Sequence, residues 1–249
     1  MDTLNRIVFF LREFFFQTGC VVCGQPCASV DEAWYGLCGN CRAEIEREIL
    51  ETREMESCDY CGKPLISEQG RCLECRRATE RAFDKAIVLF PYAGKYRKLL
   101  RGYKFDKQIA LGNFFAEIIR RTLEKKGIPP ETRIVPVPPR PGKLRKTGWD
   151  QVEYLVRLLE KRQNKERGFS VSRCLKRLKS KSQKELNLEN RQTNLKGRII
   201  PVKQAPKTAV VIDDVMTTGS TLDACAAALK ENGAETVWGL CLFYSLNNK

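Results

Sequence analysis

The residues best suited to chemistry lie in one stretch of the chain, AVVIDDVMTTGSTLDACAAALK at 209–230. An apolar run ends in two adjacent carboxylates, Asp213 and Asp214, and a turn rich in hydroxyl groups precedes an alanine-rich helical pattern. A buried strand brings such carboxylates to the carboxyl edge of a parallel sheet, where ligands bind in open α/β folds. Consecutive strand residues point to opposite faces, so the two aspartates cannot have the same task. The turn offers backbone N–H groups, hydroxyls and a positive helix end to one phosphate group.

A ligand that carries a phosphate near vicinal hydroxyls or near a bound cation would fit both the acidic pair and the hydroxyl-rich turn. A 5-phosphoribosyl group has that shape. The alternative interpretation is a strand–helix corner whose side chains only cap the helix. Capping explains Ser220 or Thr221, but it does not explain two carboxylates behind a fully apolar strand. Two other phosphate-binding patterns, GxGxxG and GxxxxGK(S/T), are absent from the sequence.

The residues VVIDDVMTTGST (210–221) resemble the signature of the type I phosphoribosyltransferases, which bind 5-phosphoribosyl 1-pyrophosphate (PRPP) with magnesium. The resemblance implies that Asp213 and Asp214 contact the ribose hydroxyls. It also implies a phosphate loop that holds the 5-phosphate, made of Thr217, Thr218, Gly219, Ser220 and Thr221.

The first third of the chain contains an internal repeat of cysteines. CVVCGQP (20–26) and CDYCGKP (58–64) share one pattern, and each is followed by a second C-x2-C knuckle that ends in Arg. The two knuckles of each repeat are separated by 14 and by 10 residues, which is zinc-ribbon spacing. The chain has 12 cysteines and no histidine, so a zinc site must be all-cysteine. The expected ligands form two sets, Cys20, Cys23, Cys38 and Cys41, then Cys58, Cys61, Cys72 and Cys75.

Four thiolates leave no open position for water, so both zinc sites are expected to be structural. Spacing does not fix which knuckles share an ion; we expect sequential pairing, with Cys27 a spectator or a substitute for Cys23. A module this short buries little apolar surface, so metal binding would supply much of its folding free energy, about 10 kcal/mol per site. Gly24 and Gly62 follow a knuckle directly, where a left-handed backbone would let amides donate to the thiolates.

Charge is distributed unevenly along the chain. Residues 1–80 carry 9 Lys/Arg and 14 Asp/Glu, whereas residues 81–249 carry 35 and 16, a net charge of +19. This basic field favours polyanions such as pyrophosphate, nucleic acid or an anionic membrane, although a solvated surface explains charge alone equally well. The N-terminal apolar run at 7–11 is too short for a signal sequence or membrane span, so a cytoplasmic location is expected. A short amphipathic helix docked on the body is favoured there over peripheral contact with the inner face of a membrane.

Strand and helix patterns alternate from Arg81 onwards, where the cysteine repeat has ended. The expected strands lie at 83–90, 133–137, 170–174, 209–212 and 236–243, and the expected helices at 96–103, 109–126, 149–162 and 219–232. This alternation predicts an α/β fold, a type I phosphoribosyltransferase-like parallel sheet flanked by helices, with a small N-terminal zinc-ribbon module. The expected domains are 1–80, an N-terminal helix and double zinc ribbon, and 81–249, the phosphoribosyltransferase-like domain.

The chain as a whole resembles the ComF family of competence-associated proteins, which join an N-terminal double zinc ribbon to a phosphoribosyltransferase domain. Besides the signature, the resemblance is carried by FPYAGKYRKLLRGYKF (90–105), VPVPPRPGKLRKTGWDQVEYL (135–155) and LKRLKSKSQKELNLENRQTNLKG (175–197). In the second of these segments, Thr147 stands where the family has arginine and Asp150 where it has asparagine.

The second segment nevertheless stays basic, and it lies beside the phosphate loop in this fold. Its candidate pyrophosphate contacts are Arg140, Lys143, Arg145 and Lys146. The third segment corresponds to the flexible lid of related enzymes, with candidate anion contacts at Lys181, Lys184 and Arg191. A lysine on a solvated helix face is the alternative for each of these.

Two functions stay open at this point. The favoured one is a PRPP-binding platform that assists uptake of single-stranded DNA in natural transformation, with DNA and a partner helicase as partners and the acidic zinc ribbon contacting protein. The other is an active phosphoribosyltransferase that moves phosphoribose from PRPP to an unidentified acceptor. Purine-type enzymes carry an acid where this chain has Thr217, and no histidine replaces it, so an orotate- or amine-like acceptor is expected rather than a purine.

Overall fold

The computed structural model describes residues 19–77, 81–162, 169–179 and 197–246. The N-terminal helix expected before residue 19 and the lid residues Lys181, Lys184 and Arg191 lie outside the described residues. Among the described residues, the central element is a parallel sheet in the order β1-β6-β5-β2. Its strands are β1 (Lys85–Pro91), β6 (Thr236–Tyr244), β5 (Thr208–Met216) and β2 (Arg133–Pro136).

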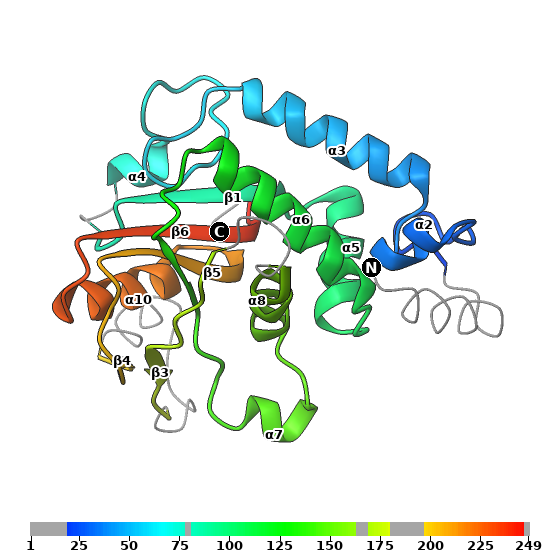
Figure 1. Ribbon diagram of the computed structural model, residues 1–249. Helices are drawn as coiled ribbons and strands as arrows, with labels where there is room; N and C mark the ends of the chain where they lie inside the picture. Colours follow the sequence, from blue (N-terminus) through cyan, green and yellow to red (C-terminus); the bar gives the residue numbers. More distant parts are fainter. Residues whose placement is uncertain (1–18, 78–80, 163–168, 180–196, 247–249) are drawn as a thin grey trace, which may run out of the picture.

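The two middle strands are buried at nearly every position because helices cover both faces of the sheet. One face is covered by α5 (Gly94–Lys104), α6 (Ala110–Lys125) and α8 (Gln151–Arg162), as Figure 1 shows. The other face is covered by α10 (Ser220–Glu231). This is the predicted α/β fold with a parallel sheet flanked by helices, and the order of the elements agrees with the sequence pattern.

Aromatic rings fill the centre of the face that α5, α6 and α8 cover. Phe90 stacks on Tyr96 with ring centroids 5.2 Å apart, and it also contacts Phe243 at 5.5 Å. Phe115 meets Tyr103 edge-to-face at 5.2 Å. This packing fixes α5 and α6 against the sheet, so it determines where the end of α5 lies relative to β5.

The cysteine-rich part is built around a long helix that the sequence analysis did not predict. Helix α3 (Gly39–Glu54) passes over β1 and α6, with the short helices α2 (Val30–Tyr35) and α4 (Leu73–Arg77) near its opposite ends (Figure 1). Its Ile45 and Ile49 are buried in the same apolar cluster as the rings of α5 and α6. The folding of this part therefore draws on burial against the sheet domain as well as on metal binding.

The four cysteines before α3 and at its start differ in location from the four after it. Cys20 and Cys41 belong to the apolar cluster on the α5–α6 face of the sheet. The four later cysteines belong to the cluster on the α10 face, together with Phe83 and Ala86. The two cysteine groups thus pack on opposite faces of one sheet.

One predicted strand is wrong. The segment at 170–174 forms only a bridge from Val171 to Ile134 at the edge of β2, with Ile134 N donating to Ser170 O at 2.8 Å. A separate antiparallel pair follows, β3 (Leu175–Arg177) with β4 (Ile199–Pro201). Strands of three residues are too short to show an alternating pattern, so sequence could not find them. The short helix α7 (Lys143–Thr147) was also not predicted.

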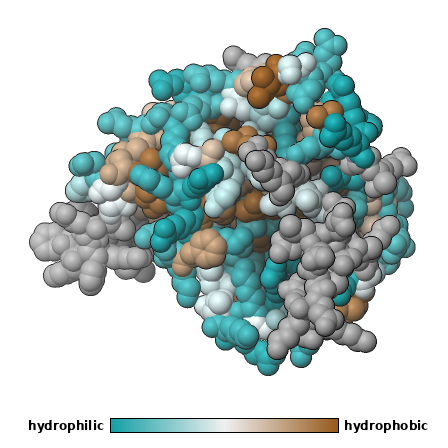
Figure 2. All heavy atoms as spheres, turned by 180° about the vertical axis from the view of Figure 1, so that it is seen from behind, coloured by the Kyte–Doolittle hydropathy of each residue, from teal (hydrophilic) through white to brown (hydrophobic). Residues whose placement is uncertain are grey.

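The outer surface on the back of the molecule is mostly hydrophilic, with apolar residues in separate patches (Figure 2). Within the described part of the chain, no helix combines the length and apolar character needed to cross a membrane.

Candidate functional site

The two aspartates lie near the carboxyl end of β5, and both are buried. Asp214 is held by two partners from different helices: Lys104 Nζ at the end of α5 and Gln151 Nε2 at the start of α8, each 2.5 Å from Asp214 Oδ2. Asp213 Oδ1 instead accepts a hydrogen bond from Asp214 N at 2.8 Å. The two carboxylates therefore have different surroundings, as their opposite orientation on the strand predicts.

These surroundings shift the two acidities in opposite directions. Burial, and then the neighbouring charge of Asp214, raise the pKa of Asp213. Burial also acts to raise the pKa of Asp214, but Lys104 and the hydrogen bond from Gln151 outweigh it and lower that pKa below the ordinary value. The pair therefore favours a single negative charge, on Asp214, until a cation or hydroxyl donors reach Asp213.

A polar network continues from Asp214 into the basic loop after β2. Lys143 Nζ lies 2.5 Å from Gln151 Oε1 and 2.8 Å from Asp150 Oδ2. The other oxygen of Asp150 caps α8, accepting from the backbone amides of Val152 and Glu153 at 3.1 and 2.9 Å. Aspartate at position 150 thus keeps the capping oxygen that asparagine would supply, and it adds a charge for Lys143.

The four candidate pyrophosphate contacts have different roles in the structure. Lys143 is committed to the network, whereas Arg140, Arg145 and Lys146 are exposed. Within the described residues, Arg145 and Lys146 make no ion pair. Burial lowers the pKa of Arg177 in β3, and the nearby positive charge of Arg140 lowers it further. The charge of Asp213 acts in the opposite direction.

The phosphate loop predicted at 217–221 leads into the first turn of α10. Gly219 precedes the helix with φ 78°, a left-handed conformation that favours glycine, and no side chain caps the helix. Thr218 Oγ1 and Ser220 Oγ lie 2.6 Å apart, and Thr217 is exposed. Ser220 N donates to Thr218 Oγ1 at 3.4 Å. The next amides of the first turn have no partner within the helix, so they are available to an anion together with these hydroxyls.

Sequence reasoning missed four residues of this site: Lys104, Gln151, Arg177 and Arg81. Arg81 donates from Nη1 to the carbonyl oxygen of Thr218 at 2.5 Å, which ties it to the phosphate loop. Lys104 and Gln151 fall in segments that carry the family resemblance, so that resemblance was the available signal. Arg81 stands in no motif, and nothing in the sequence distinguishes it from the neighbouring arginines.

The eight predicted zinc ligands form two compact groups in the predicted sequential pairing, and Cys27 belongs to neither. The four Sγ atoms of each group lie within 4.8 Å of one another. Cys23 Sγ is 3.7 Å from Cys38 Sγ, and Cys61 Sγ is 3.7 Å from Cys72 Sγ. Zn–S bonds of about 2.3 Å in a tetrahedron place sulfur atoms roughly 3.8 Å apart, so both groups fit a structural zinc ion.

The backbone favours the thiolate form of the first cysteine in each group. Burial acts against ionisation of Cys20 and Cys58, yet backbone amides lower the pKa of each thiol to about 7. Gly24 and Gly62 have the predicted left-handed backbone, with φ of 80° and 71°. As expected, neighbouring backbone amides donate to the thiols, among them Cys72 N to Cys58 Sγ at 3.4 Å. The amides of the two glycines themselves donate to the carbonyl oxygens of Cys20 and Cys58 at 2.8 and 2.9 Å.

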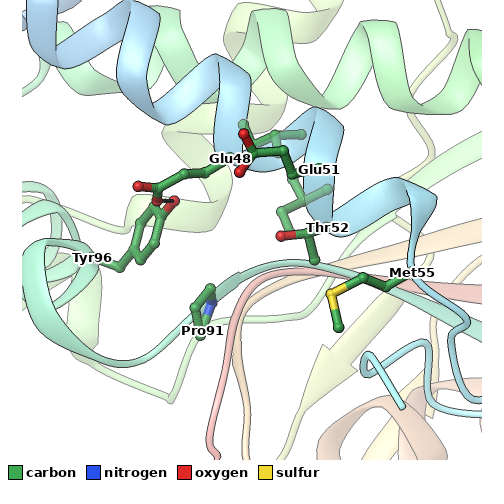
Figure 3. A pocket seen from close by; sticks show the side chains of 8 residues that line it. Glu48, Glu51, Thr52, Met55, Pro91 and Tyr96 are labelled. Atoms are coloured by element: carbon green, nitrogen blue, oxygen red, sulfur yellow. Dashed lines mark hydrogen bonds between the residues drawn. The ribbon is translucent and has the colours of Figure 1, made fainter. Parts of the chain in front are cut away.

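A separate hollow of about 430 Å³ lies under α3 (Figure 3), and neither Asp213 nor Asp214 lines it. Tyr96 donates to Glu48 Oε2 at 2.6 Å on one side of it. The carboxylates of Glu48 and Glu51 disfavour a phosphate there, so this hollow is not the candidate anion site. The residues that line it are Glu48, Ile49, Glu51, Thr52, Met55, Leu89, Pro91 and Tyr96.

The fold and the cysteine groups define a class: an α/β protein with a parallel sheet flanked by helices that carries two four-cysteine modules. The chain is 27% identical to competence protein F of Haemophilus influenzae over 240 residues, which cover 91% of this chain and 97% of that protein. It is 27% identical to competence protein ComFC of Streptococcus pneumoniae over 231 residues, 88% and 96% of the two chains. It is 26% identical to the DNA utilization protein YhgH of Escherichia coli K12 over 235 residues, 89% and 96%.

No protein-family model matches the chain. The similarity to the curated relatives nevertheless extends over nearly the whole of both chains in each comparison. This similarity to competence and DNA utilization proteins agrees with the resemblance to the ComF family that the motifs of the chain carry.

Removing one zinc ligand tests the cysteine groups. We expect Cys61→Ser to lower the zinc content of the purified protein from two ions to one per chain, because three thiolates hold the ion much more weakly. Cys27→Ser is the matched control, since Cys27 lies outside both groups, and it should retain both ions. Elemental analysis measures the zinc content, and an unchanged content in Cys61→Ser would contradict the ligand set.

Removing the cation beside Asp214 tests the polar network. Lys104→Met should reduce the free energy of unfolding by about 2–3 kcal/mol at neutral pH, since it leaves a buried carboxylate without its partner. The folded pKa of Asp214 is lowered, so this contribution is present above about pH 4, the ordinary aspartate value, and is lost as the pH falls through the folded value.

The matched control is Lys125→Met, which removes an exposed lysine of α6 and should change stability little. In a double-mutant cycle measured by urea unfolding, Lys104→Met should be less harmful when combined with Asp214→Asn. The interpretation is wrong if Lys104→Met has the same effect with and without Asp214→Asn.

Proposed function

We propose that the protein binds PRPP with magnesium at the carboxyl edge of β5, and that it uses this site as part of a platform for single-stranded DNA during DNA uptake. The observation that carries the proposal is the juxtaposition of the buried pair Asp213 and Asp214 with an uncapped helix start at Gly219. Acidic groups and a phosphate cradle follow one another within a single strand–loop–helix unit.

The phosphate half of the site is supported by the loop geometry. The left-handed Gly219 lets the chain enter α10 directly, so the amides of the first turn share the loop with the hydroxyls of Thr218 and Ser220. Positive backbone ends and hydroxyl donors bind a phosphomonoester without a lysine or arginine on the loop itself.

The ribose and pyrophosphate half is supported by charge. Asp213 is the carboxylate without a cation of its own in the network, so it is free to accept hydrogen bonds from ribose hydroxyls or to face magnesium. Arg140 and Arg177 lie on the same side, where a leaving pyrophosphate would need positive charge. Asp214 in turn binds Lys104 and Gln151, so the side chains beneath the proposed ligand are polar and held in place.

The DNA part of the proposal is supported by the relatives and by one surface. The relatives are named for competence and for DNA utilization, which supports a role in DNA uptake. Lys107 Nζ donates to Thr147 O at 3.0 Å and so joins the turn after α5 to α7. This surface, the α5–α7 surface, exposes 68% of Phe105 and 46% of Leu144 beside exposed Arg145 and Lys146. An exposed aromatic ring among cations suits unpaired bases and their phosphates.

Titration calorimetry with PRPP and magnesium tests the first part. We expect binding by the wild-type protein that is weakened about 10-fold or more by Asp213→Asn, because a charged acceptor is lost at each hydroxyl contact. The control is Asp31→Asn, which removes an exposed carboxylate that is far from Asp213 in the sequence. Absence of PRPP binding by wild-type protein would end the proposal, whereas pyrophosphate release with an added acceptor would identify an active transferase.

Salt-dependent binding of a fluorescent single-stranded oligonucleotide tests the second part. Phe105→Ala should weaken binding by about 1–3 kcal/mol through lost stacking without changing the salt dependence. Arg145→Ala combined with Lys146→Ala should reduce the salt slope by about 1.4, or about 0.7 for each lost phosphate contact.

The control for the DNA experiment combines Lys125→Ala with Lys203→Ala, which remove two exposed lysines from other parts of the surface. Equal weakening by the control pair and by the α5–α7 variants would mean that DNA binding is not localised on this surface, contrary to the proposal.

A further inference from the structure

The second four-cysteine module, residues 58–75, contacts the phosphate loop through two residues. Tyr60 stands inside the first knuckle, between the ligands Cys58 and Cys61. Its hydroxyl makes two hydrogen bonds with the backbone of Arg81: it accepts from Arg81 N at 2.6 Å and donates to Arg81 O at 3.1 Å. The knuckle therefore sets the position of the Arg81 backbone.

The side chain of Arg81 continues the contact into the loop. Its Nη1 donates to Thr218 O at 2.5 Å, and its guanidinium lies over the ring of Phe83 at 5.5 Å. A Cβ atom placed on Gly219 would collide with this Nη1, so the guanidinium packs directly against the loop glycine. The residue after Arg81, Ala82, donates from its backbone to Asp223 Oδ1 at 2.7 Å in the first turn of α10.

The knuckle is also held from its other side. Tyr60 O accepts a hydrogen bond from Ala86 N in β1 at 2.8 Å, and the Tyr60 ring lies 5.3 Å from that of Phe83. A change in the backbone between Cys58 and Cys61 would therefore disturb the contacts of Tyr60 with Ala86 and Phe83. The same change would shift Arg81 through the two hydrogen bonds of the Tyr60 hydroxyl.

We infer that metal binding by the second four-cysteine group and anion binding by the phosphate loop are energetically coupled, with Tyr60 and Arg81 as the positioning residues that join them. The anion half of this inference rests on the proposed function. A zinc ion fixes the knuckle, the knuckle fixes Arg81, and Arg81 holds the Thr218 carbonyl so that the loop keeps its anion-binding shape. Coupling of binding free energies is reciprocal, so an anion in the loop must also strengthen metal binding.

The first four-cysteine group offers an internal comparison because its knuckle contacts a different element. Lys98 Nζ of α5 donates to Val22 O at 2.8 Å, and no contact among the described residues joins Val22 to the phosphate loop. The coupling is therefore specific to the second group, and general destabilisation of the protein would affect both groups.

The test follows zinc release to a chromogenic chelator from the full-length zinc-loaded protein. Tyr60→Phe removes one hydroxyl and keeps the ring, and Arg81→Ala removes the guanidinium. Each should accelerate one of the two release phases by about five-fold or more and leave the other unchanged. Arg81→Lys should release zinc at a rate between those of wild-type protein and Arg81→Ala, since the lysine amine can donate to the Thr218 carbonyl in place of the guanidinium. Lys98→Ala is the matched control and should leave the phase accelerated by Arg81→Ala at its wild-type rate.

PRPP with magnesium then tests the reciprocal half. It should slow the same phase in wild-type protein and have less effect in Arg81→Ala, whose PRPP affinity should also be lower by a similar factor. If wild-type protein does not bind PRPP, the proposed function fails, and the ligand-free release rates still decide whether Tyr60 and Arg81 join the phosphate loop to the second metal group. Wild-type release rates in both Tyr60→Phe and Arg81→Ala would overturn the coupling, and so would equal acceleration of both phases.

Discussion

Two adjacent carboxylates at the end of a buried strand carry an electrostatic cost that the neighbouring elements must offset. In this protein the offset comes from Lys104 and Gln151, which converge on Asp214 from α5 and α8. In the sequence, α6 and the basic loop lie between those two helices. Because α5 and α8 must both reach one oxygen atom of Asp214, the positions of α6 and the basic loop are constrained as well. The network reaches Lys143 and Asp150, and it thereby fixes where the basic loop begins and where α8 starts.

The same constraint explains why the cysteine modules belong to the architecture of the site. The first knuckle contacts α5, the helix that ends in Lys104, through Lys98 and Val22. The second knuckle contacts Arg81 and, through it, the phosphate loop. The second module therefore reaches the candidate site through the phosphate loop, whereas the first module contacts α5, and the two pack on opposite faces of the sheet.

The fold and the metal ligands could be predicted from the sequence because their signals are local. Strand β5 is apolar up to its two aspartates, and the C-x2-C spacing picks out the eight cysteines that gather into two groups. Their sequential pairing was an expectation that spacing alone did not fix. Spacing and pattern did not identify the partners of the aspartates, since Lys104 and Asp214 are far apart in sequence and meet only through tertiary packing; the family resemblance of the Lys104 segment was the available signal. Helix α3 was missed because the cysteine spacing indicated a ribbon, and the helical stretch between the two repeats was not considered.

Helix α3 has a further consequence for how relatives of this protein can differ in length. It begins at the third and fourth ligands of one cysteine group and ends four residues before the first ligand of the other. Adding one residue within a helix rotates all that follows by about 100° and shifts it by about 1.5 Å. Such an insertion would leave both sets of ligands complete, yet it would rotate the first cysteine group relative to the rest of the chain and separate Val22 from Lys98. The length of this helix is therefore fixed by geometry at both ends, while its exposed side chains are free to drift.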